Sequence, residues 1–291
     1  MIIKSDTTEE AAGRALVREI QSAHFYTPQG EARYTRDDGK PVNLRDARKE
    51  NLFPSITHIM NIMENRALTI YKEKHLLAAS YNNRPLQDEL EEDYFARIIP
   101  KAREDGKQAA EFGTATHDGI ECILKGWAWD KENPLLKLAA DWIQENVEVV
   151  HWLEETLVSE SMGIAGRCDA FLKLRGMGDA VVDWKTRRFK ELKSGWKCGW
   201  YKKDVRQISF YAACVERGLE SLGLPTEVAA INIALNTREP SPIEVKEWTQ
   251  KERDNSVEMV DAINTLWRDE HNFYPFGTEH YYVGQLMPEK I

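Results

Sequence analysis

Two strand-like runs that flank Gly176, Met177 and Gly178 restrict the possible fold more than any other feature of this chain. In both runs, within residues 160–188, the apolar side chains recur at every second position, which is the period of a β-strand. Glycine permits the positive φ that a three-residue hairpin loop requires. We therefore predict an antiparallel hairpin with this loop, in which Arg175 faces Asp179.

This register decides which side chains share a face, because side chains alternate along a strand. The face expected to meet the core is apolar and carries Ile164, Cys168, Ala170, Leu172, Leu174, Ala180, Val182 and Trp184. The other face gathers Arg167, Asp169, Asp183 and Lys185, flanked by Phe171 and Val181. Asp169 is then expected opposite Lys185 and diagonal to Asp183. A loop of two or four residues would instead place Asp169 on the opposite face from Asp183.

The rest of the chain predicts helices around this hairpin and two further strands. Helices are expected over residues 8–21, 86–99, 101–125 (bent near Gly113), 134–147, 204–217 and 249–269, and a capped helix start near Pro54. Strands are expected over 150–186 (three), 229–236 and 243–248, with an earlier hairpin over 30–42. This order predicts an α/β fold with a mixed sheet flanked by helices. We expect a single domain over 1–291: a mainly helical N-terminal elaboration (1–100), a core (101–270) and a tail (271–291).

Composition narrows the class of protein. The 291 residues are 42% hydrophobic and 30% charged, as in ordinary globular proteins. We see neither a secretory signal nor an apolar run long enough to cross a membrane, so we expect a cytoplasmic protein. Its four cysteines form no C-x-x-C pair, which argues against a zinc site or a disulfide framework. A formal net charge of -9 argues against non-specific coating of nucleic acid.

One segment departs from this acidic average. Between residues 185 and 206, the basic and aromatic side chains include Arg187, Arg188, Lys190, Lys193, Trp196, Lys197, Lys202, Lys203 and Arg206. Cations attract phosphates and aromatic faces stack on unpaired bases, so the mixture favours single-stranded or frayed nucleic acid. A solvated charged loop with some buried tryptophans is the alternative.

The polar face of the hairpin predicts a metal site. Asp169 and Asp183 would repel each other without a cation between them, and carboxylate oxygens suit Mg²⁺ or Mn²⁺. Such an ion polarises a phosphodiester and lowers the pKa of bound water, and Lys185 beside it can orient that water or offset developing charge. These are the requirements of phosphodiester hydrolysis. The alternative is an exposed polar sheet face with one salt bridge.

These residues resemble the core motifs of the PD-(D/E)XK nucleases, above all the RecB-like branch that includes mitochondrial genome maintenance exonucleases. Gly166 to Asp169 is similar to the G-x-x-D motif, and Asp183 to Lys185 to the (D/E)-x-K motif. Further pieces occur in the family's order, namely Phe53 to Thr57 (P-S-[VI]-T), Gly113 to His117 (G-T-x-x-H), Glu160, and Gln207 with Tyr211 (Q-x-x-x-Y). Together the matches span roughly residues 50–215.

The resemblance implies a restriction-endonuclease-like core and a role for each matched residue. Asp169, Asp183 and His117 would bind Mg²⁺ or Mn²⁺, and Lys185 would be the catalytic lysine. Glu160, Gln207 and Tyr211 would support the site or the substrate. Relatives with an iron–sulfur cluster use one upstream cysteine and three near the C-terminus, but the last cysteine here is Cys214, so we expect no cluster.

A metal-dependent DNA exonuclease is therefore expected, acting on single strands or duplex ends in recombination, repair or replication, with a possible partner protein in those processes. Two alternatives stay open at this point. One is a structure-specific or site-specific endonuclease on the same core, and the other is a non-catalytic DNA-binding module with a nuclease fold.

Overall fold

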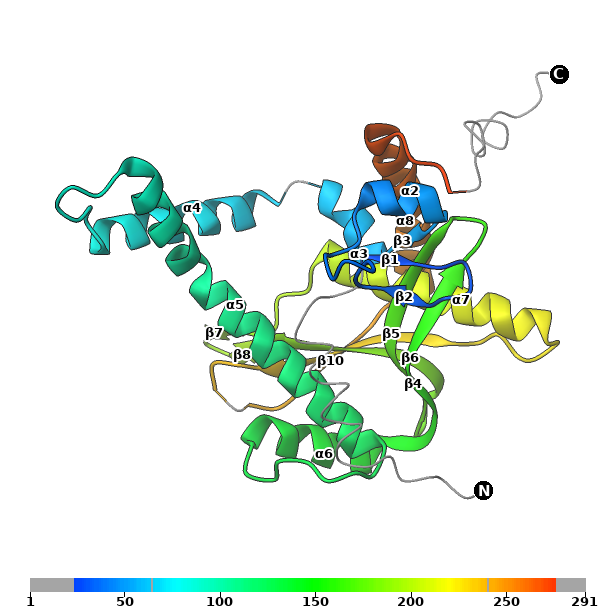
Figure 1. Ribbon diagram of the computed structural model, residues 1–291. Coiled ribbons are helices and arrows are strands. Elements are labelled where there is room, and N and C mark those ends of the chain that lie inside the picture. The colour runs from blue at the N-terminus through cyan, green and yellow to red at the C-terminus, as the bar shows by residue number, and fades with distance from the viewer. Residues whose placement is uncertain (1–23, 64, 240, 276–291) are drawn as a thin grey trace.

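A five-stranded mixed sheet forms the centre of the computed structural model, which describes residues 24–63, 65–239 and 241–275 (Figure 1). Its strands are β4 (Val147–Ser159), β5 (Ile164–Leu174), β6 (Gly178–Arg187), β9 (Ala229–Asn236) and β10 (Glu244–Glu247), in the order β10-β9-β6-β5-β4. Neighbouring strands are antiparallel except β6 and β9, which run parallel. The three strands expected over 150–186 and the two later ones are thus confirmed.

Helices pack on both faces of this sheet. On one face, α7 (Lys202–Ser221) and α8 (Gln250–His271) share a buried core with Val181 and Phe171. On the other face, the C-terminal part of α5 (Glu91–Leu124) and α6 (Pro134–Asn146) share a second core with Val182 and Leu172. Successive side chains of β6 therefore enter opposite cores, as strand alternation requires. The expected α/β fold, with a mixed sheet flanked by helices, is confirmed.

The central hairpin forms in a register two residues away from the predicted one. Asp179 faces Lys173, and Leu174 faces Gly178, so the loop residues are Arg175, Gly176 and Met177. A shift of two preserves the face of every side chain, because the side-chain period of a strand is two. Asp169 and Asp183 accordingly keep their predicted common face.

The apolar residues of this hairpin divide between the two cores. Ala170, Leu172 and Leu174 of β5 lie in the core beside α6, as expected. Ile164 and Cys168 lie in the core beside α7 instead. Simple alternation along β5 does not predict this change.

A small three-stranded sheet precedes the main one. Strands β1 (Phe25–Tyr26), β2 (Ala32–Arg33) and β3 (Phe53–Pro54) pair in the order β2-β1-β3, and α2 (Leu44–Glu50) lies between β2 and β3 in the chain. Ser55 begins α3 (Ile56–Ile59) by accepting a hydrogen bond from the His58 backbone N–H, which confirms the predicted helix start. The 3₁₀ turn η1 (Met60–Ile62) follows.

Two helices form an arm that extends away from the sheet (Figure 1). The sequence did not predict α4 (Arg66–Asn82), and the two helices expected over 86–99 and 101–125 form the single helix α5. Pro100 lies inside α5, and Gly113 does not interrupt it. The helix expected over 8–21 lies outside the described residues.

The remaining described elements complete the connections. The short strands β7 (Lys190–Leu192) and β8 (Gly195–Lys197) form a separate hairpin between β6 and α7. Helix α6 begins with Pro134 after the Asn133 cap, and α8 begins with a capping box between Thr249 and Glu252. A search of the described residues finds no helix with the length and apolar character of a membrane span.

Candidate metal and catalytic site

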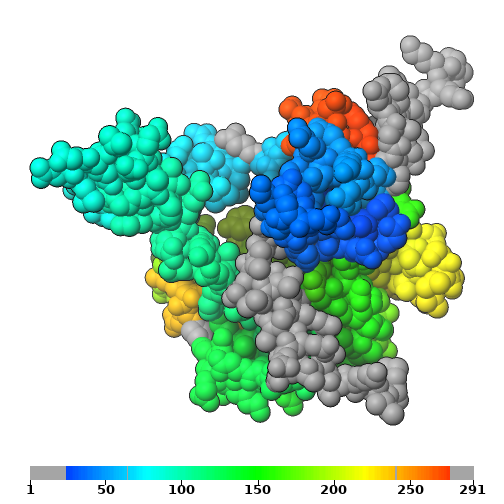
Figure 2. All heavy atoms as spheres, in the orientation of Figure 1, coloured from blue at the N-terminus to red at the C-terminus, as the bar shows by residue number. Residues whose placement is uncertain are grey.

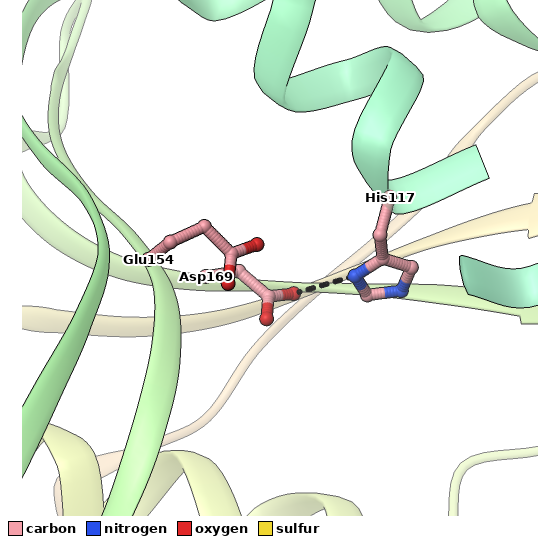
Figure 3. A group of neighbouring side chains, drawn as sticks. All are labelled: His117, Glu154 and Asp169. Atoms are coloured by element: carbon pink, nitrogen blue, oxygen red, sulfur yellow. Dashed lines mark ion pairs between the residues drawn. The ribbon is translucent and has the colours of Figure 1, made fainter. Parts of the chain in front are cut away.

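Three side chains of types that can ligate a metal converge from three different elements beside the hairpin. His117 of α5, Glu154 of β4 and Asp169 of β5 each offer a ligand atom, and these atoms all lie within 4.8 Å of one another (Figure 3). His117 Nδ1 lies 3.3 Å from Asp169 Oδ2. One imidazole and two carboxylates form a donor set that can hold a divalent cation.

Gly113 allows α5 to lie close to the sheet, and His117 of the same helix lies beside the sheet as a result. A Cβ at Gly113 would lie 3.2 Å from Thr186 Oγ1, so α5 approaches β6 closely at this point. His117 lies four residues further along α5 and shares that face of the helix. The spacing of the G-T-x-x-H segment thus has a geometric basis in this chain.

A backbone irregularity brings Glu154 to the same place. Leu153 pairs with Ala170 and Glu155 pairs with Cys168, so Glu154 lies beside Asp169 on the neighbouring strand. Its φ of 55° is left-handed, which is costly for a residue with a Cβ. Such strain is often found at functional sites.

Hydrogen bonds and an ion pair hold the two carboxylates of this group. Asp169 Oδ2 accepts a 2.8 Å hydrogen bond from the Trp184 backbone N–H, which fixes it against β6. Glu154 forms an ion pair with Arg167, whose Nε lies 2.7 Å from Oε2. We call His117, Glu154 and Asp169 the triad from here on.

Asp183 and Lys185 form a second, adjacent group. Lys185 Nζ lies 2.6 Å from Asp183 Oδ2, and the Asp183 residue is only 1% exposed. Asn232 of β9 donates a 2.7 Å hydrogen bond to the same carboxylate, and the Trp248 indole N–H donates to Asn232 Oδ1 at 2.7 Å. Asp183 is therefore held in place by its partners on β6 and β9.

The side chains of α7 continue this network. Lys185 Nζ donates to Gln207 Oε1 at 3.2 Å, and Gln207 Nε2 donates to the Tyr211 hydroxyl at 3.2 Å. Tyr211 fits because Gly166 has no side chain: a Cβ there would lie 2.8 Å from both Tyr211 Cε1 and Ile56 Cγ2. The predicted residues of the Q-x-x-x-Y helix thus lie next to the predicted lysine.

Burial and close charges shift the acid–base behaviour of these groups. Burial raises the pKa of Asp183 to about 6 despite the Lys185 ammonium, and the Asp169 carboxylate adds to the rise. Burial opposes the charged form of Asp169 as well, but His117 and Lys185 outweigh it and lower the pKa of that carboxyl. Burial would lower the pKa of His117, but Asp169 raises it above its ordinary value. The carboxylates likewise outweigh burial at Lys185 and raise its pKa, so the ammonium stays charged.

A cavity of about 470 Å³ opens onto the triad. Its walls come from the small N-terminal sheet, α3, α5, α7 and the ends of β5 and β6, and they include Tyr26, Tyr34, Thr57, Thr114, Thr186 and Gln207. Among the described residues a larger cavity, of about 740 Å³, lies elsewhere between α7, β9 and α8 and contains no triad residue. The space next to the triad is large enough for part of a polar substrate.

The structure does not bring Glu160 into this site. Glu160 lies in the exposed turn after β4, whereas the glutamate beside Asp169 is Glu154, roughly 20 Å away along the strand. No sequence motif marks Glu154, because its position depends on the pairing of β4 with β5 and on a local left-handed φ. Of the predicted metal ligands, His117 and Asp169 belong to the triad, and Asp183 lies in the adjacent group.

The basic segment separates into three parts. Arg187 is half-buried, where it pairs with Asp204 and donates to the Gly199 carbonyl at 2.6 Å, so it fixes the chain before α7. The second part is the β7–β8 hairpin and its start, with Arg188, Lys190, Lys193 and Lys197 exposed and Trp196 half-buried under Arg238. The third part is the start of α7, with Lys202 and Lys203 exposed and Arg206 half-buried. Lys203 Nζ donates a 3.3 Å hydrogen bond to Asn61 Oδ1, so the start of α7 contacts the turn after α3.

Comparisons with known proteins find only distant likeness. The sequence matches no protein-family model and no curated protein sequence. The chain is similar to a solved structure from Eubacterium rectale that bears the name of a candidate exonuclease, with 14% identity, a TM-score of 0.33, and coverage of 92% of this chain and 87% of that chain. It is also similar to the solved structure of SSO0001, with 16% identity, a TM-score of 0.30, and coverage of 78% of this chain and 98% of that chain. Likeness at these TM-scores assigns neither a fold nor an activity to the chain.

Proposed function

We propose that this chain is a nuclease that hydrolyses DNA phosphodiester bonds with a bound divalent cation. The observation that carries the proposal is the triad, a histidine and two carboxylates within 4.8 Å, beside the buried Asp183–Lys185 pair. A structural salt bridge alone does not require a third acidic side chain held in a strained left-handed conformation next to another carboxylate. We further propose that residues 1–291 act as one nuclease domain.

The donor set fits Mg²⁺ or Mn²⁺. Carboxylate oxygens suit both ions, and an imidazole favours Mn²⁺ over Mg²⁺. His117 Nδ1, a Glu154 oxygen and an Asp169 oxygen would hold the ion, and Asp183 is close enough to Asp169 to contribute to its charge environment. The bound ion would polarise the scissile phosphate and lower the pKa of a water molecule.

The chain's own residues then have distinct roles. Lys185 is held by Asp183 and Gln207, so its ammonium is positioned to orient the attacking water and to offset charge that develops on the phosphate. Tyr211 and Gln207 keep Lys185 in place from α7. Asp183, with its pKa of about 6, balances the lysine charge in the absence of substrate.

The exposed basic residues would guide the nucleic acid. Lys202 and Lys203 lie at the start of α7, the helix whose Gln207 contacts Lys185, and the β7–β8 hairpin adds Lys190, Lys193 and Trp196. Cations near the scissile bond attract the phosphate backbone, and an aromatic side chain can stack on an unpaired base. The choice of an exonuclease in recombination, repair or replication follows the resemblance to RecB-like nucleases.

The test is digestion of end-labelled single- and double-stranded DNA with Mg²⁺, Mn²⁺ or EDTA. Asp169→Asn and Lys185→Ala should each abolish a metal-dependent loss of label that the wild type shows. Asp179→Asn is the matched control, since Asp179 is an aspartate of β6, the strand next to that of Asp169, but pairs with His151 away from the triad. Early short products would indicate an exonuclease, and early long fragments an endonuclease. Intact DNA under both metals, together with tight binding of DNA, would favour the non-catalytic module.

A further inference from the structure

Arg167 is the only arginine or lysine among the described residues that line the cavity beside the triad. It lies on β5 two residues before Asp169, so both side chains leave the same face of the sheet. The cavity wall also carries the carboxylates of Asp118, Glu154 and Asp169. Arginine is always charged in proteins, whereas the charge of His117 depends on protonation. Within the described part of this wall, Arg167 is therefore the one side chain that keeps a positive charge at every working pH.

The ion pair with Glu154 orients the guanidinium but does not use all of it. Arg167 Nε lies 2.7 Å from Glu154 Oε2, and no other described residue forms an ion pair with Arg167. A guanidinium has more N–H groups than one carboxylate can accept. Nε itself is buried, yet the side chain is 36% exposed, so the exposure belongs to its other atoms. N–H groups that Glu154 does not accept are thus accessible from the cavity.

The position of Arg167 suits a strand that passes the triad. The small N-terminal sheet contributes Tyr26 and Tyr34 to one wall of the cavity, and α5 contributes Gly113 and His117 to another. In Figure 2 the small sheet (blue) and α5 (turquoise to green) lie on either side of a hollow in the surface. Because Arg167 Nε contacts a carboxylate of the triad, a strand that enters this hollow meets the guanidinium and the triad together.

A phosphate group is the ligand that fits this guanidinium. The planar fork of arginine donates paired hydrogen bonds to two oxygens of one phosphate, a contact that a lysine ammonium cannot reproduce. The carboxylates of the cavity repel a phosphate, so a nucleic acid that occupies the cavity needs a positive charge beside them. Tyr34 and Thr57 add hydroxyl groups to the same walls, and hydroxyl groups can also donate to phosphate oxygens.

We propose that Arg167 binds a phosphate group of the substrate strand beside the triad, while Glu154 holds the guanidinium in position. This assignment rests on the proposed function, because it takes a nucleic acid as the ligand of the cavity. A carboxylate has two oxygens and can contact a guanidinium and a cation at once, so Glu154 would align Arg167 with the cation site.

Fluorescence anisotropy of a labelled single-stranded oligonucleotide tests the contact, in EDTA and with Ca²⁺ as a probe ion. Arg167→Gln should raise the dissociation constant about tenfold and lower the slope of log affinity against log salt by about 0.7, since one charged contact to a phosphate is lost. Arg167→Lys keeps the charge without the fork, so it should keep the salt slope and recover only part of the affinity.

Lys173→Gln is the matched control. Lys173 lies on the same strand roughly 20 Å from Arg167, its side chain is 44% exposed, and it pairs with Glu148 outside the cavity. The substitution removes the same charge and should leave both the affinity and the salt slope unchanged. An equal loss in Lys173→Gln and Arg167→Gln would show an effect of net charge alone and would overturn the proposal.

A methylphosphonate series makes the test independent of folding defects. A methylphosphonate replaces one charged phosphate oxygen by a methyl group, and a single such linkage is moved along the oligonucleotide. At one position the wild type should lose about tenfold in affinity and Arg167→Gln should lose little, because its contact is already absent. A misfolded variant would weaken binding without this dependence on position. Equal losses in both proteins at every position would contradict a contact between Arg167 and a phosphate.

The result is separable from the test of nuclease activity. A wild type that cleaves DNA with metal but binds it no better than Arg167→Gln would overturn the role of Arg167 and leave the nuclease intact. A wild type that binds DNA neither in EDTA nor with Ca²⁺ would also overturn that role. A position-dependent loss in a chain that never cleaves DNA would support Arg167 as a phosphate ligand and contradict the nuclease.

Discussion

Replacement of Glu154 by glycine should make the metal-free protein more stable than the wild type and the metal-bound protein less stable than the wild type. The φ of 55° at Glu154 is left-handed, which costs an L-residue about 1–2 kcal/mol and costs glycine little. Removal of the carboxylate also ends its repulsion by Asp169, whose ligand oxygen lies within 4.8 Å. The lost ion pair with Arg167 offsets part of this gain, by about 0.5 kcal/mol, because Arg167 is 36% exposed.

The net effect should raise the free energy of unfolding of the metal-free protein by about 0.5–1 kcal/mol. Glu155→Gly is the matched control. Glu155 is the next residue of the same strand, is exposed and is not among the described residues with positive φ, so glycine there should lower the free energy of unfolding by about 0.5–1 kcal/mol. Without metal, Glu154→Gly should therefore melt at a higher temperature than the wild type, and Glu155→Gly at a lower one.

The two variants should also differ in how much Mn²⁺ stabilises them. Mn²⁺ stabilises a protein in proportion to the logarithm of its affinity for the folded state, so a tenfold weaker site reduces the stabilisation by about 1.4 kcal/mol at saturating metal. Glu154→Gly should lose this increment in a thermal or urea unfolding series with Mn²⁺, and Glu155→Gly should keep it. Destabilisation of metal-free Glu154→Gly would refute the account of backbone strain, and an unchanged Mn²⁺ response would refute the role of Glu154 as a ligand.

Three further predictions concern packing and charge. Gly166→Ala should lower the free energy of unfolding by about 1–3 kcal/mol, since the new methyl group would lie 2.8 Å from two neighbouring side-chain carbons. Gly218→Ala inside α7 is the control: a Cβ there meets nothing within 4 Å, so this variant should raise the free energy of unfolding by about 0.5–1 kcal/mol. Urea unfolding measures both. Burial and two neighbouring histidines lower the pKa of His58 to about 4, so the unfolded chain takes up the proton first and stability falls as pH drops from about 6.5 towards 4. After discounting for the partial exposure of the ring, the wild type should lose about 1 kcal/mol more than His58→Phe between pH 7.5 and pH 5, and equal losses would contradict the assignment. Lys185→Met leaves the Asp183 carboxylate buried without its cation, at a cost of about 3 kcal/mol at pH 8. The folded pKa of Asp183 is raised, so this cost should shrink as the pH falls and the carboxyl is protonated; a pH-independent cost in urea unfolding would argue against it.

The local patterns of the sequence were sufficient for much of the fold. The period of two along β5 and β6 predicted both strands and the common face of Asp169 and Asp183, even though the register was wrong by two residues. The predicted face of each side chain was still correct, because a shift by one full side-chain period leaves every residue on the same face of the sheet. The capped starts of α3 and α6, and the strands β9 and β10, likewise depend on neighbouring residues alone. In contrast, α4 was not predicted, since none of its residues enters the core and no single apolar face marks it.

The composition of the site was decided mostly by tertiary structure. The sequence motifs placed His117, Asp169 and Lys185 correctly in one neighbourhood, because each motif fixes a residue relative to its own helix or strand. Glu154 belongs to no motif, and it reaches the triad through strand pairing with β5 and a left-handed φ that no pattern of residue types records. The partnership of Asp183 with Asn232 likewise depends on the parallel pairing of β6 with β9, 49 residues apart in the chain. Sequence alone determines what a residue does within its own turn or strand, whereas contacts between distant strands are set by how the whole sheet assembles.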